Sequence, residues 1–328
     1  MFHRIFFLAS MLLCWSAATF AQKQKTVLTA EIYDYSREMI YIDCVQSPLF
    51  NQEFHTNPGE IHEFAFETAE PLTLLINGNT KVLMEPGDSL HVKMRYDKKA
   101  VGSMEFSGTP AAVANNRFYW ELDRLKRGMK YRPQLLSCIV LDVKPKDRLA
   151  DSHTLLARLN ERLQASEGSL TATAVDYMRA ETEAAAYNSL MEYPVMYAET
   201  RKLPVDQQEI GDYWSLMDGY TLSSKDTWLR CPDYVSMLMR YCFYQSEKQA
   251  RAQGATYEMP RKMEDMYAAF SGFAGYTPEQ RDAVLYTLLC NFIRNGREIE
   301  RAEALLDSYK TTYNRKKAYL DVLNHLLQ

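Results

Sequence analysis

Cysteines are the side chains of this sequence that could most readily carry out chemistry, because a thiolate is both a nucleophile and a redox group. Five of them lie beyond residue 21, and no two form a Cys-x-x-Cys pair: Cys44, Cys138, Cys231, Cys242 and Cys290. Cys231 and Cys242 are the only close pair, and they are therefore the candidate reactive thiols. At about 1.5 Å of rise per residue they could not meet along one straight helix, so a disulfide between them would require a chain reversal. The alternative is that the cysteines are small, buried apolar residues.

Histidines and glycine-rich loops form no recognisable catalytic or metal-binding pattern. Five histidines beyond residue 21 are scattered along the chain: His55, His62, His91, His153 and His325. His62-Glu63 begins the zinc-binding pattern His-Glu-x-x-His, but Phe66 stands where the second histidine belongs. No Gly-x-Ser-x-Gly elbow and no glycine-rich phosphate loop occur. We therefore predict no catalytic residue, no metal and no cofactor.

Aromatic residues between positions 190 and 230 are candidates for a ligand groove. Aromatic rings with polar edges can line a groove that binds a sugar or a peptide. The alternative is a helical core filled by large amphipathic residues. The candidates are Tyr193, Tyr197, Tyr213, Trp214, Tyr220 and Trp228.

The first 21 residues have the features of a cleavable signal peptide, with Arg4 before an apolar run and Ala21 at the expected cleavage site. Leu13, rather than a small residue, precedes Cys14, so we do not expect a lipoprotein. No later run is long enough for a transmembrane helix. Removal of residues 1–21 takes away one basic side chain and leaves 37 basic and 42 acidic ones. The signal peptide predicts an exported protein. The charge balance predicts that the protein does not bind nucleic acid.

Residues 26–107 have the alternating pattern of antiparallel strands. The pattern is clearest at 89–96, where Leu90, Val92 and Met94 share one face. Pro86-Gly87-Asp88 and Asn77-Gly78 are typical of tight turns. Strands that recur at this spacing indicate a sandwich or a barrel. Seven are expected, over residues 27–35, 39–45, 61–68, 72–77, 81–85, 89–96 and 101–107.

Beyond residue 108 the apolar spacing becomes helical. Thr109-Pro110 is typical of a helix start, Pro194 should end or kink a long helix, and Thr277-Pro278-Glu279-Gln280 is a capping box. The predicted fold class is α+β with segregated domains. A β-rich domain, an antiparallel sandwich or barrel, spans residues 22–108 after the signal peptide (1–21). An all-α domain of helical hairpins spans 109–328.

One family resemblance rests on residues 83–92 (Leu-Met-Glu-Pro-Gly-Asp-Ser-Leu-His-Val), on Phe106-Ser107-Gly108-Thr109 and on Asn115-Asn116. This segment resembles the N-terminal β domain of secreted TlpA/ResA-like thiol–disulfide oxidoreductases of Gram-negative envelopes. In that family a helical region and then a thioredoxin fold follow. The resemblance covers residues 24 to about 120. Beyond them only the layout of a helical region after the β domain is similar, including the stretch 228–234.

The resemblance implies a relative of the accessory region of these proteins rather than an oxidoreductase. The sequence stops at Gln328, where the thioredoxin domain of the family would begin, and it has no Trp-Cys-x-x-Cys. No catalytic residue can therefore be carried over. The implied location is the periplasm or outer envelope of a Gram-negative bacterium.

Three functions remain open from the sequence. The leading hypothesis is a non-catalytic binding or assembly module of the cell envelope. The second is a component of a periplasmic thiol–disulfide pathway that works with a separate thioredoxin-like partner or uses Cys231 or Cys242 directly. The third is a sugar- or peptide-binding protein that uses the aromatic residues. The partners that these hypotheses predict are a thioredoxin-like protein or another envelope protein.

Overall fold

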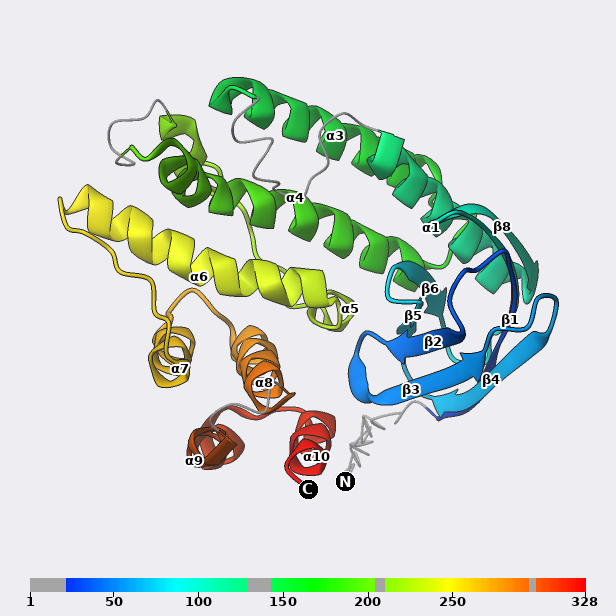
Figure 1. Ribbon diagram of the computed structural model, residues 1–328. Coiled ribbons are helices and arrows are strands. Elements are labelled where there is room, and N and C mark those ends of the chain that lie inside the picture. The colour runs from blue at the N-terminus through cyan, green and yellow to red at the C-terminus, as the bar shows by residue number, and fades with distance from the viewer. Residues whose placement is uncertain (1–21, 129–142, 204–209, 295–298) are drawn as a thin grey trace, which may run out of the picture.

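The fold is α+β, with strands and helices segregated along the chain, as the sequence predicts (Figure 1). This computed structural model describes residues 22–128, 143–203, 210–294 and 299–328. The expected signal peptide and Cys138 lie outside them. The last strand ends at Gly108, and the first helix begins at Pro110. None of the helices in these ranges combines the length and the apolar composition that crossing a membrane requires.

The strands form a sandwich of two four-stranded sheets, one ordered β4-β1-β7-β8 and the other β3-β2-β5-β6. All neighbouring strands are antiparallel except β1 and β7, which are parallel. Leu28, Leu74 and Val92 are among the buried residues between the sheets. The strand bounds are β1 Gln24–Tyr33, β2 Met39–Cys44, β3 Ser47–His55, β4 Ile61–Thr68, β5 Leu72–Ile76, β6 Thr80–Met84, β7 Ser89–Asp97 and β8 Ala100–Gly108.

Seven of these strands match the predicted ones to within a few residues, and β3 was missed. Strand β3 contains Pro48, which cannot donate to a sheet ladder and argues against a strand. The proline is tolerated because β3 lies at the edge of its sheet. The predicted turns are present, with Asn77, Gly78 and Gly87 at positive φ.

The two sides of the sandwich, where the edges of its sheets face each other, are closed by different contacts. On one side, Phe50 of β3 packs on Phe64 and Phe66 of β4, with ring centroids 4.8 and 5.1 Å apart. On the other side, the first helix, α1 (Pro110–Gly128), contacts β6, β7 and β8. Its residues Ala112 and Val113 pack into the sandwich core. The first helix therefore completes the β-rich part rather than standing apart from it.

Gly108 makes the change from strand to helix possible. Its φ is +134°, and a β-carbon there would lie 2.1 Å from the carbonyl oxygen of Ser89. The next residue, Thr109, remains bound to the sheet, because the Ser89 N–H donates to its hydroxyl at 2.7 Å. Thr109 occupies the helix start as predicted, but its hydroxyl is used to hold α1 against β7.

Asn116 of α1 binds the edge of β6 that has no neighbouring strand. The backbone N–H of Leu83 donates to its amide oxygen at 2.8 Å, and its amide nitrogen donates to the Leu83 carbonyl at 2.7 Å. The amide thus takes the place of a neighbouring strand. Its neighbour Asn115 donates to Glu85 and to Thr171, which ties the same edge to the following helices.

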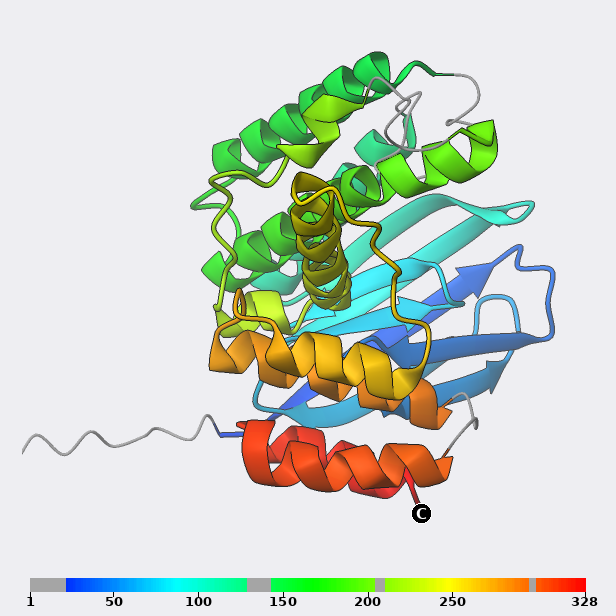
Figure 2. The same cartoon turned by 90° about the vertical axis from the view of Figure 1, so that its left-hand side faces the viewer.

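The helices form successive layers beside the sandwich, and Figure 2 shows the orange to red C-terminal helices running side by side. Leu83 of β6 belongs to the helical core, so this core packs directly on the outer face of the β3-β2-β5-β6 sheet. The remaining bounds are α3 Pro145–Ala165, α4 Ala172–Arg201, η2 Gly211–Trp214, α5 Asp226–Leu229, α6 Pro232–Ala252, α7 Met263–Gly272, α8 Pro278–Arg294, α9 Ile299–Ser308, η3 Tyr309–Tyr313 and α10 Lys317–Leu326.

Two helix signals had different outcomes. The capping box is confirmed, since the Thr277 N–H donates to Gln280 and the Gln280 N–H donates to the Thr277 hydroxyl. Pro194 does not end α4, which continues for seven further residues to Arg201. Buried tertiary packing around Pro194 and Tyr193 outweighs the loss of one backbone hydrogen bond there.

Replacing Asn116 by alanine should destabilise the fold. The change leaves the N–H and C=O of Leu83 without their partners in a buried place, which costs about 2–4 kcal/mol. Urea unfolding monitored by circular dichroism would measure the loss. The exposed Asn51 of β3 offers a matched control, and Asn51→Ala should change the free energy of unfolding by less than about 0.5 kcal/mol. Equal stability of the two variants would contradict this role of Asn116.

Candidate functional site

The two candidate thiols lie on one helix and do not meet. Cys231 is the residue that precedes α6, Cys242 lies within α6, and both are free and buried. No chain reversal separates them, so a disulfide between them is not formed. Burial raises the pKa of Cys231 above its ordinary value, and burial raises the pKa of Cys242 to about 12. Thiols in this state are poor nucleophiles at neutral pH.

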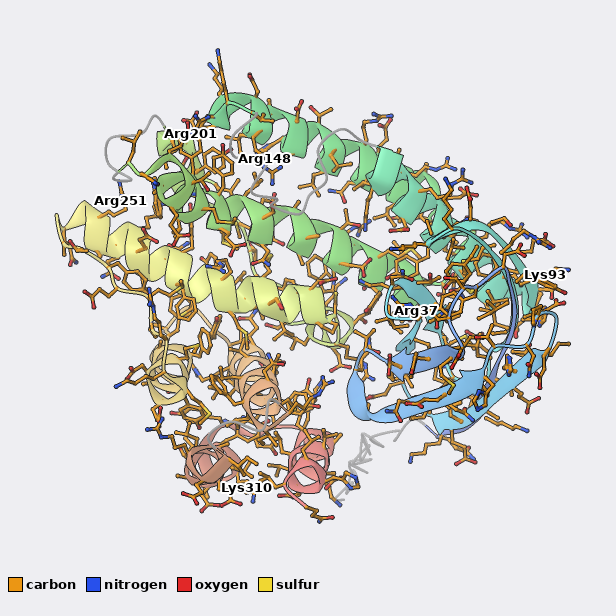
Figure 3. All side chains as sticks on the ribbon, in the orientation of Figure 1. Arg37, Lys93, Arg148, Arg201, Arg251 and Lys310 are labelled. Carbon is orange, nitrogen blue, oxygen red and sulfur yellow. The ribbon has the colours of Figure 1, made fainter. Side chains whose placement is uncertain are left out.

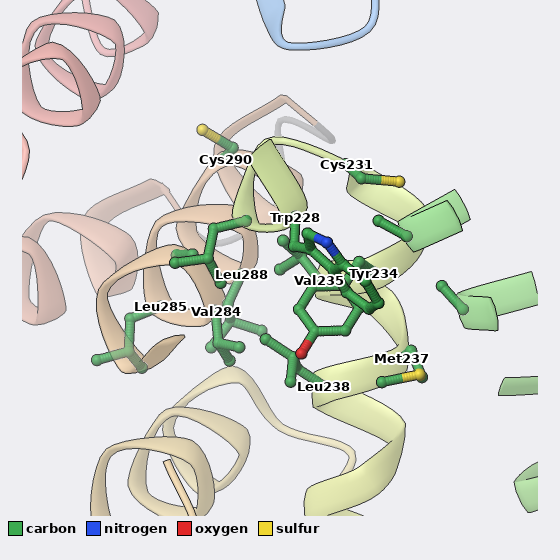
Figure 4. Packing of buried hydrophobic residues seen from close by; sticks show 14 of the residues in the cluster. Trp228, Cys231, Tyr234, Val235, Met237, Leu238, Val284, Leu285, Leu288 and Cys290 are labelled. Carbon is green, nitrogen blue, oxygen red and sulfur yellow. The ribbon is translucent and has the colours of Figure 1, made fainter. Parts of the chain in front are cut away.

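The other two described cysteines are also buried. Burial raises the pKa of the Cys44 thiol, and it raises the pKa of Cys290 to about 11. Figure 4 shows Cys231 and Cys290 on different helices with their sulfur atoms directed away from each other. Cysteine here acts as a small core residue, the alternative that the sequence left open.

The six candidate aromatic residues are distributed over several packing environments. Tyr193 stacks on Tyr197 and on Tyr213, with ring centroids 5.5 and 4.7 Å apart. Tyr193 and Tyr213 are almost completely buried, and the Tyr213 hydroxyl donates to the Pro145 carbonyl at 2.7 Å. This group fixes α4 against the start of α3. Two of its three rings, Tyr193 and Tyr213, are closed off from solvent.

The buried Arg148 explains part of that stack. Figure 3 shows it between α3 and α4, and its guanidinium lies 5.9 Å from the Tyr193 ring centroid. It donates to the hydroxyls of Ser152 and Ser189. Burial lowers the pKa of Arg148. The aromatic rings therefore shield a buried cation.

The remaining three aromatic candidates pack elsewhere. The ring of Trp214 stacks on that of Tyr244, and the Tyr220 hydroxyl donates to Glu183 at 2.9 Å. Trp228 is buried and meets Tyr234 edge to face (Figure 4). The structure thus brings together Tyr193, Tyr197 and Tyr213, and it leaves Trp214, Tyr220 and Trp228 apart from them.

The strongest convergence of ionisable groups lies between the sandwich and the helices. We call it the junction network, and its members are Lys81 of β6, Tyr119 and Lys126 of α1, Glu181 of α4 and Asp233 of α6. Glu181 is at its centre and only 5 % exposed. It forms an ion pair with Lys81, a second with Lys126 at 3.6 Å, and accepts a hydrogen bond from Tyr119 at 2.8 Å.

The charges of the junction network are mutually compensated. Burial acts to raise the pKa of Glu181, but Lys126, Lys81 and the Tyr119 hydrogen bond outweigh it, so the pKa is lowered. Burial acts to lower the pKa of Lys81, but Glu181 and Asp233 outweigh it and raise the pKa. At neutral pH Glu181 and Lys81 are therefore both charged, and Glu181 is a poor general base because both of its oxygens are engaged.

A second polar contact joins the same two parts of the molecule around Gln46. Its amide nitrogen donates to Tyr177 of α4 at 3.4 Å and to the Arg230 carbonyl at 3.3 Å. Its amide oxygen accepts from the Thr73 N–H at 2.8 Å. Arg230 in turn pairs with Glu70 of the sandwich. The junction is therefore bound at two places.

Within the described residues, no group of three or more His, Cys, Asp or Glu side chains is placed to hold a metal ion. A surface groove of about 500 Å³ lies between α1 and α3, with Leu122 and Leu125 beside an ion pair of Glu121 and Arg162 at 3.2 Å. Arg158 and Glu161 complete its polar lining.

Comparison of the chain with protein-family models, curated proteins and solved structures finds no match. The resemblance to the TlpA/ResA-like group therefore stays a prediction. The residues that carry it have structural roles in this fold, since Gly87 turns the chain, Gly108 approaches Ser89, and Asn116 covers β6.

The junction network was not found from the sequence. Glu181 lies in an alanine-rich helix, and an acidic residue in such a helix normally reads as part of its exposed face. Pairing of Glu181 with Lys81, a hundred residues away in sequence, could not be inferred from spacing.

Thiol titration tests the burial of the cysteines. In a Cys138→Ser variant that starts at Gln22, the four described thiols should react slowly with Ellman's reagent in native buffer. All four should react rapidly in guanidinium chloride, because unfolding removes the burial that raises their pKa values. A thiol that reacts at the rate of free cysteine in the native protein would contradict this assignment.

Glu181→Gln should destabilise the protein by about 3–5 kcal/mol, because it removes the buried counter-charge that the partly buried Lys81 and Lys126 share. Asp233→Asn is the matched control. This carboxylate is half exposed, and its loss should cost less than about 1 kcal/mol. Equal losses for the two variants, measured by urea unfolding at neutral pH, would contradict the central position of Glu181.

The same pair of proteins should show a defined pH dependence. The folded pKa of Glu181 lies below its ordinary value of 4.5, so its stabilising contribution is present above that value and is lost as the pH falls through the folded pKa. The difference in unfolding free energy between the wild type and Glu181→Gln should therefore shrink in acid. A difference that grows as the pH falls below 4.5 would contradict the direction of the shift.

Proposed function

We propose that this chain is an exported envelope protein that acts as a non-catalytic binding or assembly module, related to the accessory region of TlpA/ResA-like proteins. One observation carries the proposal. Where ionisable groups converge most closely, at the junction network, every charge is used to hold the helices on the sandwich. This is the chemistry of a scaffold, whose functional groups are those left on its surface.

Two further observations support a scaffold. The candidate thiols are buried, with pKa values raised away from the range of a reactive thiolate. The best-stacked candidate aromatic residues support α3 and α4 from within. These placements disfavour direct use of Cys231 or Cys242 in disulfide exchange, and they disfavour an aromatic sugar groove.

Purified protein lacking residues 1–21 should show no turnover in insulin reduction and none with generic ester, glycoside and peptide substrates. Insulin reduction by a thioredoxin, run in parallel, provides the positive control. Turnover above the buffer blank that one point substitution abolishes would overturn the proposal. Turnover that survives every substitution at a candidate residue would come from a contaminant. Further purification should then lower the activity to that of the buffer blank.

A further inference from the structure

Three of the four sheet edges carry features that discourage pairing with another strand. The edge of β6 is bound by Asn116. Strand β3 contains Pro48, and its register with β2 shifts beside Cys44. The register of β8 with β7 shifts beside Tyr96. Proline, bulges and covering side chains are the usual protections of an edge strand.

Strand β4 lacks all of these features within the described chain. It pairs with β1 in unbroken register from Ile61 opposite Glu31 to Thr68 opposite Gln24. Its sequence contains no proline, lysine or arginine. The side chains of Ile61, Glu63 and Ala65 are exposed, and Ile61 is 60 % exposed.

The open backbone groups of β4 can be assigned by residue. The Val27 N–H donates to Asp88 on the β7 side of β1, so the groups of Leu28, the next residue, point to β4. Leu28 lies opposite Phe64. It follows that Phe64 and Phe66 bond to β1, whereas the N–H and C=O groups of Ile61, Glu63, Ala65 and Glu67 point to the open edge.

Strand β4 is held in place by its packing on the sandwich core. Its inward side chains His62, Phe64 and Phe66 are buried, and they pack on Phe54 and Phe50 of β3. A partner strand would therefore meet a preformed edge and would not have to order it, which lowers the entropic cost of binding.

The stretch of sequence that contains β4 is acidic. No lysine or arginine occurs between Arg37 and Lys81, whereas seven acidic residues do: Glu38, Asp43, Glu53, Glu60, Glu63, Glu67 and Glu70. Glu70 is paired with Arg230. Glu63 lies opposite the neutral Thr29, and Glu67 lies opposite Lys25. An incoming strand would meet Glu63 and Glu67 on one face.

We propose that β4 binds an extended, basic segment of a partner protein as an added strand, an inference that rests on the proposed binding function and names its surface. Main-chain bonds to the open groups of β4 would give affinity, and lysine or arginine opposite Glu63 and Glu67 would give specificity. A second copy of this chain fits less well. Antiparallel β4–β4 pairing centred on Ala65 places Glu63 opposite Glu67, and like charges directly opposite are destabilising.

The test uses protein lacking residues 1–21 and an end-blocked peptide of alternating lysine and valine, matched in length to β4 and labelled with a fluorophore. Fluorescence anisotropy should show binding. A glutamate–valine peptide should not bind, and neither should the lysine–valine peptide with alternate backbone nitrogens methylated. The methylated peptide keeps its charge and loses its donors, so equal binding of both lysine peptides would overturn strand addition.

Ala65→Pro removes one outward N–H and leaves the bonds between β4 and β1 intact. It should weaken binding about tenfold, whereas Ala65→Val, which keeps the N–H, should bind as the wild type does. Glu63→Gln should weaken binding about threefold, and Glu105→Gln on the far edge strand β8 should not. Unfolding midpoints of the variants show that each is folded. Equal affinity of Ala65→Pro and Ala65→Val would overturn the proposal.

Amide hydrogen exchange measures directly which backbone N–H groups of β4 the peptide protects. The lysine–valine peptide should slow exchange at alternate residues of β4, including Glu63 and Ala65, with little change at Phe64 and Phe66. Uniform slowing, or none, would overturn strand addition. Self-association of the free protein that is abolished by Ala65→Pro, without peptide binding, would show that a second copy is the occupant and would likewise overturn it. None of these outcomes involves turnover of a substrate. Each would therefore contradict strand addition at β4 without contradicting the proposed non-catalytic function.

Discussion

Glu181 is a carboxylate that the fold must neutralise where it lies, because α4 places it between the sandwich and the helices with almost no access to solvent. An isolated carboxylate there would cost several kcal/mol. Lys81 arrives from β6 and Lys126 from α1, so the charge is compensated only when strand, first helix and long helix are assembled together. The positions of α1 and α4 on the sheet are thereby coupled, and the later helices build on α4 through α6.

The closure of the sandwich depends on the same assembly. Helix α1 fills the open side between β6 and β8, and Asn116 satisfies the edge of β6 next to Lys81. The β-rich part consequently has one side closed by its own aromatic rings and one closed by a helix from the following region.

Local signals in the sequence were sufficient for most elements. Alternation at Leu90, Val92 and Met94, the turn at Gly87 and the reciprocal cap of Thr277 and Gln280 depend on neighbours a few residues away, and each is present. Helix α4 does not end at Pro194, and β3, which contains Pro48, was missed. Proline disfavours strand and helix interiors through a single missing N–H, and an edge position or a buried core can outweigh that cost. The network around Glu181 and the stack around Arg148 join distant segments, and their partners are visible only in three dimensions.

The placement of the chemically capable groups argues for function at the surface. The candidate thiols and the candidate tyrosines Tyr193 and Tyr213 are in the interior, together with the Arg148 guanidinium. Burial there raises the pKa of Cys242 to about 12 and lowers that of Arg148. Burial of this kind stabilises packing but removes a group from any substrate. What the sandwich still offers to solvent is a strand edge with unpaired donors and acceptors, beside Glu63 and Glu67. Such an edge can pair with the backbone of another polypeptide, and this is the ground for the proposed binding function.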